Sequence, residues 1–154
     1  VISYNAGISA CGTCGQWQQG LALLSRMLEA KLWPGVVSYS TGIGACARGK
    51  QWQWALSLLR DVWEAKLQPS ATSYGAGISA CASSGRWQLA LSLLGSMDQQ
   101  RVEQDTSSYV AGISACNAGR QWQLALALLS WMVEVKLWPD VASYSAGISA
   151  CTSS

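Results

Sequence analysis

The sequence predicts an all-α solenoid, in which antiparallel pairs of helices stack on one another. The main observation is a phrase of nine residues at positions 3–11 that returns, lightly changed, from Ser38, Ser73, Ser108 and Ser143. The step between copies is always 35 residues, and a unit of about 20 to 50 residues cannot bury its own apolar face and has to stack on its neighbours. The second and third observations are a stripe of leucines and a stripe of small residues, which identify two helices in each repeat.

We expect the whole chain to form one repeat array. Five copies of the phrase exceed the roughly three repeats that a solenoid needs for stability. The sequence begins at the first residue of a repeat and stops partway through another, which indicates a fragment of a longer array, without a visible targeting segment. The predicted units are four full repeats and the first helix of a fifth, at residues 1–35, 36–70, 71–105, 106–140 and 141–154.

The second half of each repeat is predicted to be a helix. In the first repeat an apolar residue recurs at the spacing of one helical face, at Trp17, Leu21, Leu24 and Leu28. We expect a turn glycine before this helix and, after it, a proline, which a helix does not continue through. The turn glycines are Gly15, Gly49, Gly85 and Gly119, and the prolines are Pro34, Pro69 and Pro139.

The first half of each repeat is also predicted to be a helix, although its Val, Ile, Ser and Gly content would favour a strand or a loop. Tyr4, Ile8 and Cys11 are spaced by four and three residues, and this periodicity outweighs propensity. Small residues beside that stripe let two helices approach closely, which explains a glycine that costs roughly 1 kcal/mol against alanine. The glycine recurs as Gly7, Gly42, Gly77, Gly112 and Gly147.

Composition narrows the class of function. Half of the residues are apolar, but no run reaches the roughly 18 uninterrupted apolar residues of a membrane span, so we expect no membrane partner. The net charge of +2 argues against an indiscriminate polyanion binder and suits a site that reads a single strand one residue at a time. Electrostatics alone select no partner.

Catalysis and cofactor binding are not expected. Histidine is absent, which removes the commonest general base and the usual metal ligand. Residues 7–11 come near a nucleophile elbow, and residues 42–47 come near a dinucleotide fingerprint. Both segments lie inside predicted first helices and belong to the repeated phrase. We therefore predict that the chain is not an enzyme.

Five of the six cysteines share one repeat position. Equivalent positions of stacked helix pairs lie roughly 10 Å apart, beyond the roughly 7 Å that a disulfide tolerates. These cysteines are therefore predicted to be core thiols in a reducing compartment. Cys14, the sixth, lacks the paired cysteines or histidines of a zinc site. The five are Cys11, Cys46, Cys81, Cys116 and Cys151.

The nine tryptophans fall into two groups. Four share the phase of the leucine stripe and are predicted to pack between repeats rather than to stack on bases. These are Trp17, Trp52, Trp87 and Trp122. The remaining tryptophans are candidates for a protein partner surface, and they are Trp33, Trp54, Trp63, Trp131 and Trp138.

With these landmarks the chain resembles the pentatricopeptide repeat family. It has the 35-residue period, with Tyr at the fourth position, Gly near the fifteenth, Ala at the twentieth, Met at the twenty-seventh and Pro at the thirty-fourth. A tetratricopeptide array has a period of about 34 residues and a Trp early in its first helix, whereas the phased tryptophans here open the second helix. The resemblance covers the whole chain and implies a right-handed superhelix.

The resemblance implies single-stranded RNA binding, with one base read per repeat by two or three side chains on the concave face. In the family, the fifth and last residues of a repeat face the base and the second residue clamps it. The base-facing residues here are Asn5 with Gly35, Ser40 with Ser70, Gly75 with Asp105, Val110 with Asp140, and Ser145, and the clamps are Ile2, Val37, Thr72, Ser107 and Ala142. The resemblance also implies a mitochondrion or plastid, and a role in organelle RNA processing, stability or translation.

These side chains predict a weak base preference. Asn and Ser donate to and accept from a base edge, and a terminal Asp accepts from the ring N–H of uracil or guanine. We expect a pyrimidine at the first repeat, a purine at the second, and uracil or guanine at the third and fourth. Arg48 is the one cation of the predicted groove, so the affinity per repeat should be low. Other cations lie at turns, at Lys50, Arg86 and Arg120.

A protein scaffold is the alternative function. The base-facing positions are poor in polar atoms, the groove is nearly neutral, and tryptophans are in surplus. These features favour an array that holds a protein partner, for example within a ribonucleoprotein complex. Recovery of bound RNA from the full-length protein would separate the two functions.

Overall fold

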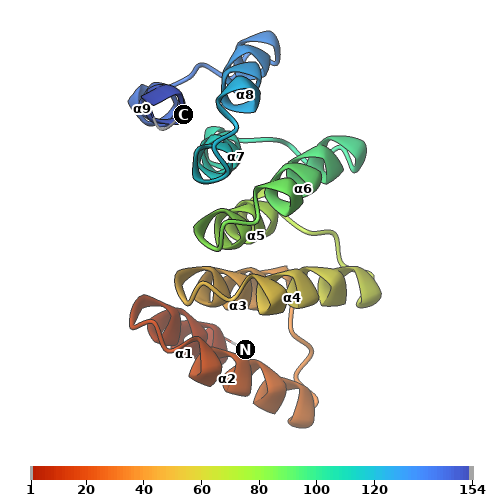
Figure 1. Ribbon diagram of the computed structural model, residues 1–154. Coiled ribbons are helices and arrows are strands. Elements are labelled where there is room, and N and C mark those ends of the chain that lie inside the picture. Colours follow the sequence, from red (N-terminus) through yellow and green to blue (C-terminus); the bar gives the residue numbers. More distant parts are fainter. Residues whose placement is uncertain (1, 153–154) are drawn as a thin grey trace.

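The computed structural model describes residues 2–152, and nine α-helices lie in that span. They pack in repeating pairs (Figure 1), which confirms the predicted all-α fold. None of these nine helices combines the length and the apolar character needed to cross a membrane. Residues 1, 153 and 154, at the limits of the predicted array, lie outside the described residues. The first helices of the pairs are α1 (Ile2–Thr13), α3 (Val36–Arg48), α5 (Ala71–Ser83), α7 (Thr106–Ala118) and α9 (Val141–Thr152), and the second helices are α2 (Trp17–Glu29), α4 (Trp52–Glu64), α6 (Trp87–Gln99) and α8 (Trp122–Glu134).

The first helices form a continuous row. Each of α1, α3, α5 and α7 contacts the next first helix, and the row runs along one side of the stack in Figure 1. Each second helix contacts the first helix of its own pair and that of the next pair. Within residues 2–152, no Cα atom of one second helix comes within 8 Å of another second helix. Every close approach between helices of successive repeats therefore involves at least one first helix.

The buried core follows the two predicted stripes. Ile78 of a first helix and Met97 of a second helix are both fully buried. The glycine of the small-residue stripe lies between leucines of two second helices, because a Cβ on Gly112 would come 3.3 Å from Leu94 Cδ2 and 3.5 Å from Leu128 Cδ1. The distance to Leu94 is tighter than an ordinary contact, whereas the distance to Leu128 is an ordinary van der Waals contact. Glycine at this position thus permits the close helix approach that the sequence predicts.

The turn after the first helix differs from the prediction in two repeats. Gly49, predicted as a turn glycine, has an ordinary φ of −79°, and the left-handed residue is Lys50, with φ 55°. The Lys50 N–H donates to the carbonyl of Ala47 at 3.1 Å, and the Gln51 N–H donates to the carbonyl of Cys46 at 2.9 Å. This pair of bonds is the Schellman ending of a helix. The fourth repeat does the same with Gly119 and Arg120, whereas the first and third repeats have left-handed Gly15 and Gly85.

Gly49 has another role, which is to make room for a tryptophan. A Cβ on Gly49 would lie 2.8 Å from Cγ of Trp17, and a Cβ on Gly119 would lie 2.5 Å from Cγ of Trp87. The indole rings of two phased tryptophans therefore pack against the turn of the following repeat. Packing between repeats is the role predicted for them from the sequence.

The prediction of five core thiols is wrong at the two ends of the array. Cys151 is exposed and Cys11 is half-buried, because each lies on a terminal first helix with a neighbouring repeat on one side only within residues 2–152. Trp122, predicted to pack between repeats, is likewise 40% exposed. The three interior thiols are buried as predicted, and burial raises the pKa of each to about 11. They are Cys46, Cys81 and Cys116.

Candidate nucleic-acid interface

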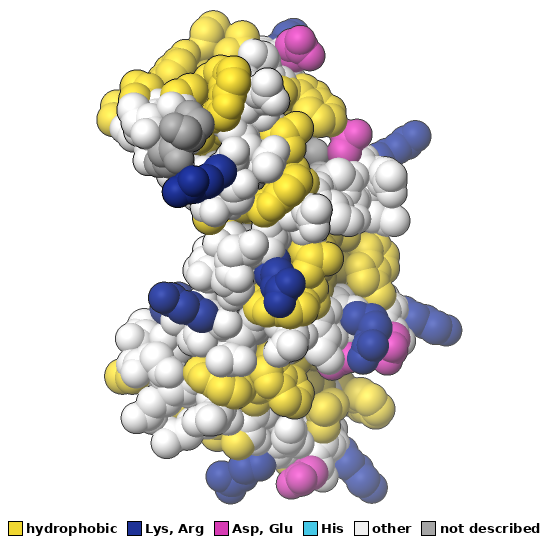
Figure 2. Space-filling view, in the orientation of Figure 1, with side chains coloured by type: hydrophobic (Ala, Val, Ile, Leu, Met, Phe, Trp, Pro, Cys, Tyr) yellow, Lys and Arg dark blue, Asp and Glu magenta, His cyan; other side chains and the backbone are white. Residues whose placement is uncertain are grey.

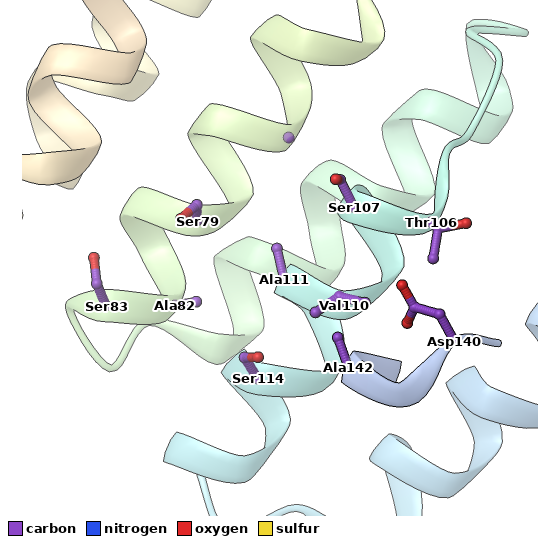
Figure 3. A pocket seen from close by; sticks show the side chains of 11 residues that line it. Ser79, Ala82, Ser83, Thr106, Ser107, Val110, Ala111, Ser114, Asp140 and Ala142 are labelled. Atoms are coloured by element: carbon purple, nitrogen blue, oxygen red, sulfur yellow. The ribbon is translucent and has the colours of Figure 1, made fainter. Parts of the chain in front are cut away.

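The row of first helices carries two adjoining hollows. The α3–α5 hollow, of about 730 Å³, lies between those two helices. The α5–α7 hollow, of about 620 Å³, lies between the next two and reaches the start of α9 (Figure 3). Gly75 and Ser107 line both hollows, so the two form one extended surface.

Most of the predicted RNA-binding residues line these two hollows. They come from the second, third and fourth predicted repeats and from the start of the fifth. They are Val37, Ser40, Arg48, Ser70, Thr72, Gly75, Asp105, Ser107, Val110, Asp140 and Ala142.

Four of the predicted residues lie outside the walls of the hollows. Ile2, at the start of α1, is 87% exposed, and Asn5 is half-buried on the same helix. Gly35 precedes α3, and Ser145 is exposed on α9. The structure thus gathers the predicted residues of the middle repeats and leaves those of the first repeat apart, together with Ser145.

The last residue of a repeat has a structural role that the sequence analysis missed. Asp105 Oδ1 accepts hydrogen bonds from the backbone N–H of Ser108 at 2.9 Å and from its hydroxyl at 2.6 Å. Asp140 Oδ1 accepts the same pair from Ser143, at 2.9 and 2.8 Å. These bonds lower the pKa of Asp140, and the bond from the backbone N–H has the largest effect. The two carboxylates therefore cap α7 and α9. An Asp directly before two of the predicted first helices was the signal for this role.

The α3–α5 hollow is lined by a cluster of hydroxyl groups. Ser40 Oγ donates to the carbonyl of Val36 at 2.7 Å, and it lies 2.5 Å from Ser73 Oγ and 3.4 Å from Ser70 Oγ. The Ser70 and Ser73 hydroxyls are 3.0 Å apart. The fifth and last residues of the second repeat therefore meet through their side chains.

The α5–α7 hollow has fewer polar groups at the predicted base-facing positions. Gly75 has no side chain, and Val110 has no polar atom. Figure 3 shows Val110 near Ala142 and Asp140, all three of them lining residues. The Asp140 carboxylate is therefore the acceptor that a base would meet at this end of the hollow.

Arg48 is the cation of this surface. It lines the α3–α5 hollow, and its Nε donates to the carbonyl of Gly12 at 2.8 Å. Among the residues that line the two hollows it is the only Lys or Arg. Arg86 lies elsewhere, with its guanidinium 5.0 Å from the ring centroid of Trp52, in a cation–π contact. The other basic side chains visible in Figure 2 project singly and form no continuous positive patch on that face.

Comparison with protein families identifies the repeat. A model described as a pentatricopeptide repeat domain matches residues 92–153, and the PPR repeat model matches residues 2–32 and 72–102. The chain belongs to the pentatricopeptide repeat family. A comparison with curated protein sequences found no significant match.

Solved structures of pentatricopeptide repeat proteins share the fold of this chain. Maize PPR10 superposes with a TM-score of 0.78 at 26% identity, over 97% of this chain and 22% of PPR10. PPR10 in complex with an 18-nucleotide psaJ RNA element superposes with a TM-score of 0.87 at 19% identity, over 96% of this chain and 22% of that one. The PPR domain of Arabidopsis thaliana protein-only RNase P 1, in complex with tRNA, gives 0.79 at 13% identity, over 97% and 79%. The present chain thus spans about a fifth of the length of PPR10.

The second-helix side of this pentatricopeptide array is more apolar than the surface formed by the first helices. All five tryptophans that lack the leucine phase are exposed. Trp54, Trp63 and Trp131 lie on second helices, and Trp33 and Trp138, more than four fifths exposed, lie in the links after α2 and α8. An apolar hollow of about 240 Å³ opens between α6 and α8, where Leu91, Leu124 and Trp131 form walls. Figure 2 shows hydrophobic side chains gathered over the α8–α9 end.

The chemistry of the first-helix surface is hydrogen bonding. Its polar side chains are Ser and Thr hydroxyls, the Asp105 and Asp140 carboxylates and the Arg48 guanidinium. Within residues 2–152 no three His, Cys, Asp or Glu side chains come together as metal ligands do. The surface can therefore donate to and accept from a polar ligand along its length.

Proposed function

We propose that this pentatricopeptide repeat array binds single-stranded RNA along its row of first helices, with one base per repeat. The observation that carries the proposal is the gathering of predicted base-facing and clamping residues of three successive repeats in two adjoining hollows. The fold similarity to PPR10 and to the PPR domain of protein-only RNase P 1, both solved with RNA, supports it. The binding is non-catalytic.

The polar groups of the hollows suggest which bases are preferred. The Asp105 and Asp140 carboxylates are acceptors, and they favour uracil or guanine, whose ring N–H groups donate. The Ser40 hydroxyl, already donating to Val36, accepts from a donor on a purine edge. With Arg48 as the one lining cation, little counterion release accompanies binding, so the affinity depends weakly on salt.

The proposal is tested by changing one base-facing residue. Val110→Asn adds an amide beside Asp140, and we expect it to enrich uracil at one position of RNA selected from a random pool at about 100 mM salt. Val133→Asn is the matched control, because Val133 is 50% exposed on a second helix. An unchanged base preference in the Val110 variant, or an equal change in the control, would overturn the proposal.

Protein binding is the second candidate function, and the exposed tryptophans of the second-helix side favour it. If the array is a scaffold, Trp54→Ala and Trp131→Ala should abolish capture of a protein partner by the full-length protein and leave RNA recovery unchanged. RNA recovery from the wild-type protein at background level would favour the scaffold over the RNA reader.

We also propose a mitochondrial or plastid location, since proteins of this family are mostly organellar. The function would then be processing, stability or translation of organelle transcripts. Fractionation of cells that express the full-length protein tests the location. Exclusive recovery in the cytosol would overturn it.

A further inference from the structure

Each junction between successive repeats has an equivalent place for a hydrogen-bond acceptor. We call it the slot, and it lies at the last residue of one repeat, beside the third residue of the next. The side chain of the last residue of a repeat accepts from the third residue of the next repeat. Asp105 and Asp140 accept from the backbone N–H and the hydroxyl of Ser108 and Ser143, and Ser70 Oγ accepts from the backbone N–H of Ser73 at 3.2 Å. An acceptor oxygen at the start of the first helix therefore satisfies these donors in three of the four junctions.

The first junction lacks this acceptor. Its last residue is Gly35, whose backbone is extended (φ −90°, ψ 179°) like that of Ser70 (φ −83°, ψ 164°) and Asp105 (φ −112°, ψ 166°). A Cβ on Gly35 would meet no heavy atom within 4 Å. The protein thus places no side chain where the other junctions place an acceptor, and the space there is open.

The donors of the first junction are left without a partner inside the described structure. Ser38 is fully buried, and its Oγ makes no hydrogen bond. The backbone N–H of Ser38 belongs to the first turn of α3, whose donors have no partner within the helix. Ser38 holds the same repeat position as Ser108 and Ser143, whose hydroxyls donate to the carboxylate in the slot of their own junctions.

Asn5 is the other polar side chain expected at the first junction. Ser40, at the same repeat position as Asn5, lies 2.5 Å from Ser73 Oγ and 3.4 Å from Ser70 Oγ. The equivalent neighbours of Asn5 are Ser38 and Gly35, and Asn5 Oδ1 is also buried without a hydrogen bond. The amide of Asn5 can therefore turn its NH₂ donors toward the slot.

We propose that the Gly35 slot binds an oxyanion, with one carboxylate or phosphate oxygen in the place that Asp105 Oδ1 and Asp140 Oδ1 occupy at their junctions. The Ser38 N–H, the Ser38 hydroxyl and the Asn5 amide donate to that oxygen. The N-terminus of α3, a helix of 13 residues, adds a favourable dipole. The site shares Asn5 and Gly35 with the predicted base-facing residues of the first repeat, but it does not require RNA, because the anion can be free in solution or part of an RNA backbone.

Amide resonances recorded by nuclear magnetic resonance during titration of the whole chain test the site. Sodium formate and inorganic phosphate supply free oxyanions, an oligouridylate supplies backbone phosphates, and sodium chloride at equal ionic strength is the reference. We expect a saturable shift of the Ser38 amide, and no such shift of the Ser108 amide, whose slot is filled by Asp105. A shift with formate or phosphate identifies a free-anion site, and a shift with the oligouridylate alone identifies an RNA phosphate site.

Variants at Gly35 separate the slot from other effects. Gly35→Asp places a carboxylate in the slot and should abolish the Ser38 shift, with a rise in melting temperature in plain buffer. Gly35→Ala adds a Cβ without an acceptor and should keep the shift. The proposal is overturned if none of the three ligands shifts Ser38, or if the shift persists in Gly35→Asp. Loss of RNA binding with a persistent formate effect would overturn only the proposed RNA function.

Discussion

Lys50 is the residue at which the structure makes its sharpest stability prediction. It ends α3 in the left-handed region with φ 55°, and the equivalent residues of the first and third repeats are glycines, Gly15 and Gly85. A side chain with a Cβ in this region costs about 1–2 kcal/mol. Glycine avoids that cost but loses about 0.5–1 kcal/mol through the greater freedom of the unfolded chain. We therefore expect the change of backbone freedom and strain in Lys50→Gly to contribute about 0.5–1 kcal/mol of stability.

Lys50→Ala is the matched control, because alanine keeps the Cβ and the strain. Both variants lose the positive charge at the end of α3, which is worth about 0.3–1 kcal/mol at a helix C-terminus, so the charge cancels in the comparison. The glycine variant should exceed the alanine variant by about 1 kcal/mol, or about 2–4 °C in melting temperature for a chain of this size.

Urea denaturation followed by circular dichroism measures the difference. Because a repeat array can unfold in more than one step, the transitions must be compared at equal slope. Equal midpoints for Lys50→Gly and Lys50→Ala would refute the reasoning, since the left-handed backbone would then carry no strain that glycine relieves.

Three further predictions concern packing, thiols and the last helix. Gly49→Ala should destabilise the protein by about 1–3 kcal/mol because its Cβ overlaps the Trp17 ring, and an unchanged urea midpoint would contradict this packing. Cys14, which is exposed, should react with a thiol reagent at pH 8 far faster than Cys81, whose pKa is raised to about 11 by burial, and comparable labelling of both thiols would show that the core opens. Because the pKa of Cys81 lies above its ordinary value of 9.0, the unfolded chain loses this proton first, and the free energy of unfolding should fall as the pH rises from about 9 to 11. Deletion of residues 141–154 uncovers the leucine face of α8 and should promote self-association in sedimentation experiments, whereas a monomer with an unchanged melting temperature would show that α9 is no cap.

The repeat period made the architecture predictable. Stripes such as Tyr74, Ile78 and Cys81 lie on a helical face and are buried, and their phase returns every 35 residues. The conformation at Lys50 was not predictable from propensity, because the adjacent Gly49 offers a more obvious turn residue. What decides there is tertiary packing, in which the Trp17 ring of the preceding repeat requires the glycine.

The sequence predicted part of the lining of the two hollows but not the bonds within it. Position within the repeat selected eleven lining residues, and it did not select others, such as Thr41 and Ser79. It did not show that Asp105 caps a helix, because capping and base reading use the same residue type at the same place. Exposure at the ends, as for Cys151, depends on what covers a helix rather than on its own sequence.

The separation between the two layers of helices has a mechanical consequence. Each first helix contacts the next first helix, while no Cα atom of one described second helix comes within 8 Å of another second helix, and a hollow opens between α6 and α8. Stretching the array along its axis would pull apart the closely packed row of first helices, which is costly in a dense interior. Bending it toward or away from the second helices opens or closes the spaces between them, where the backbones of neighbouring second helices are not in close contact. We therefore expect a change of curvature to be the easiest motion of the array, so that the first-helix surface keeps its repeat spacing while its radius of curvature changes.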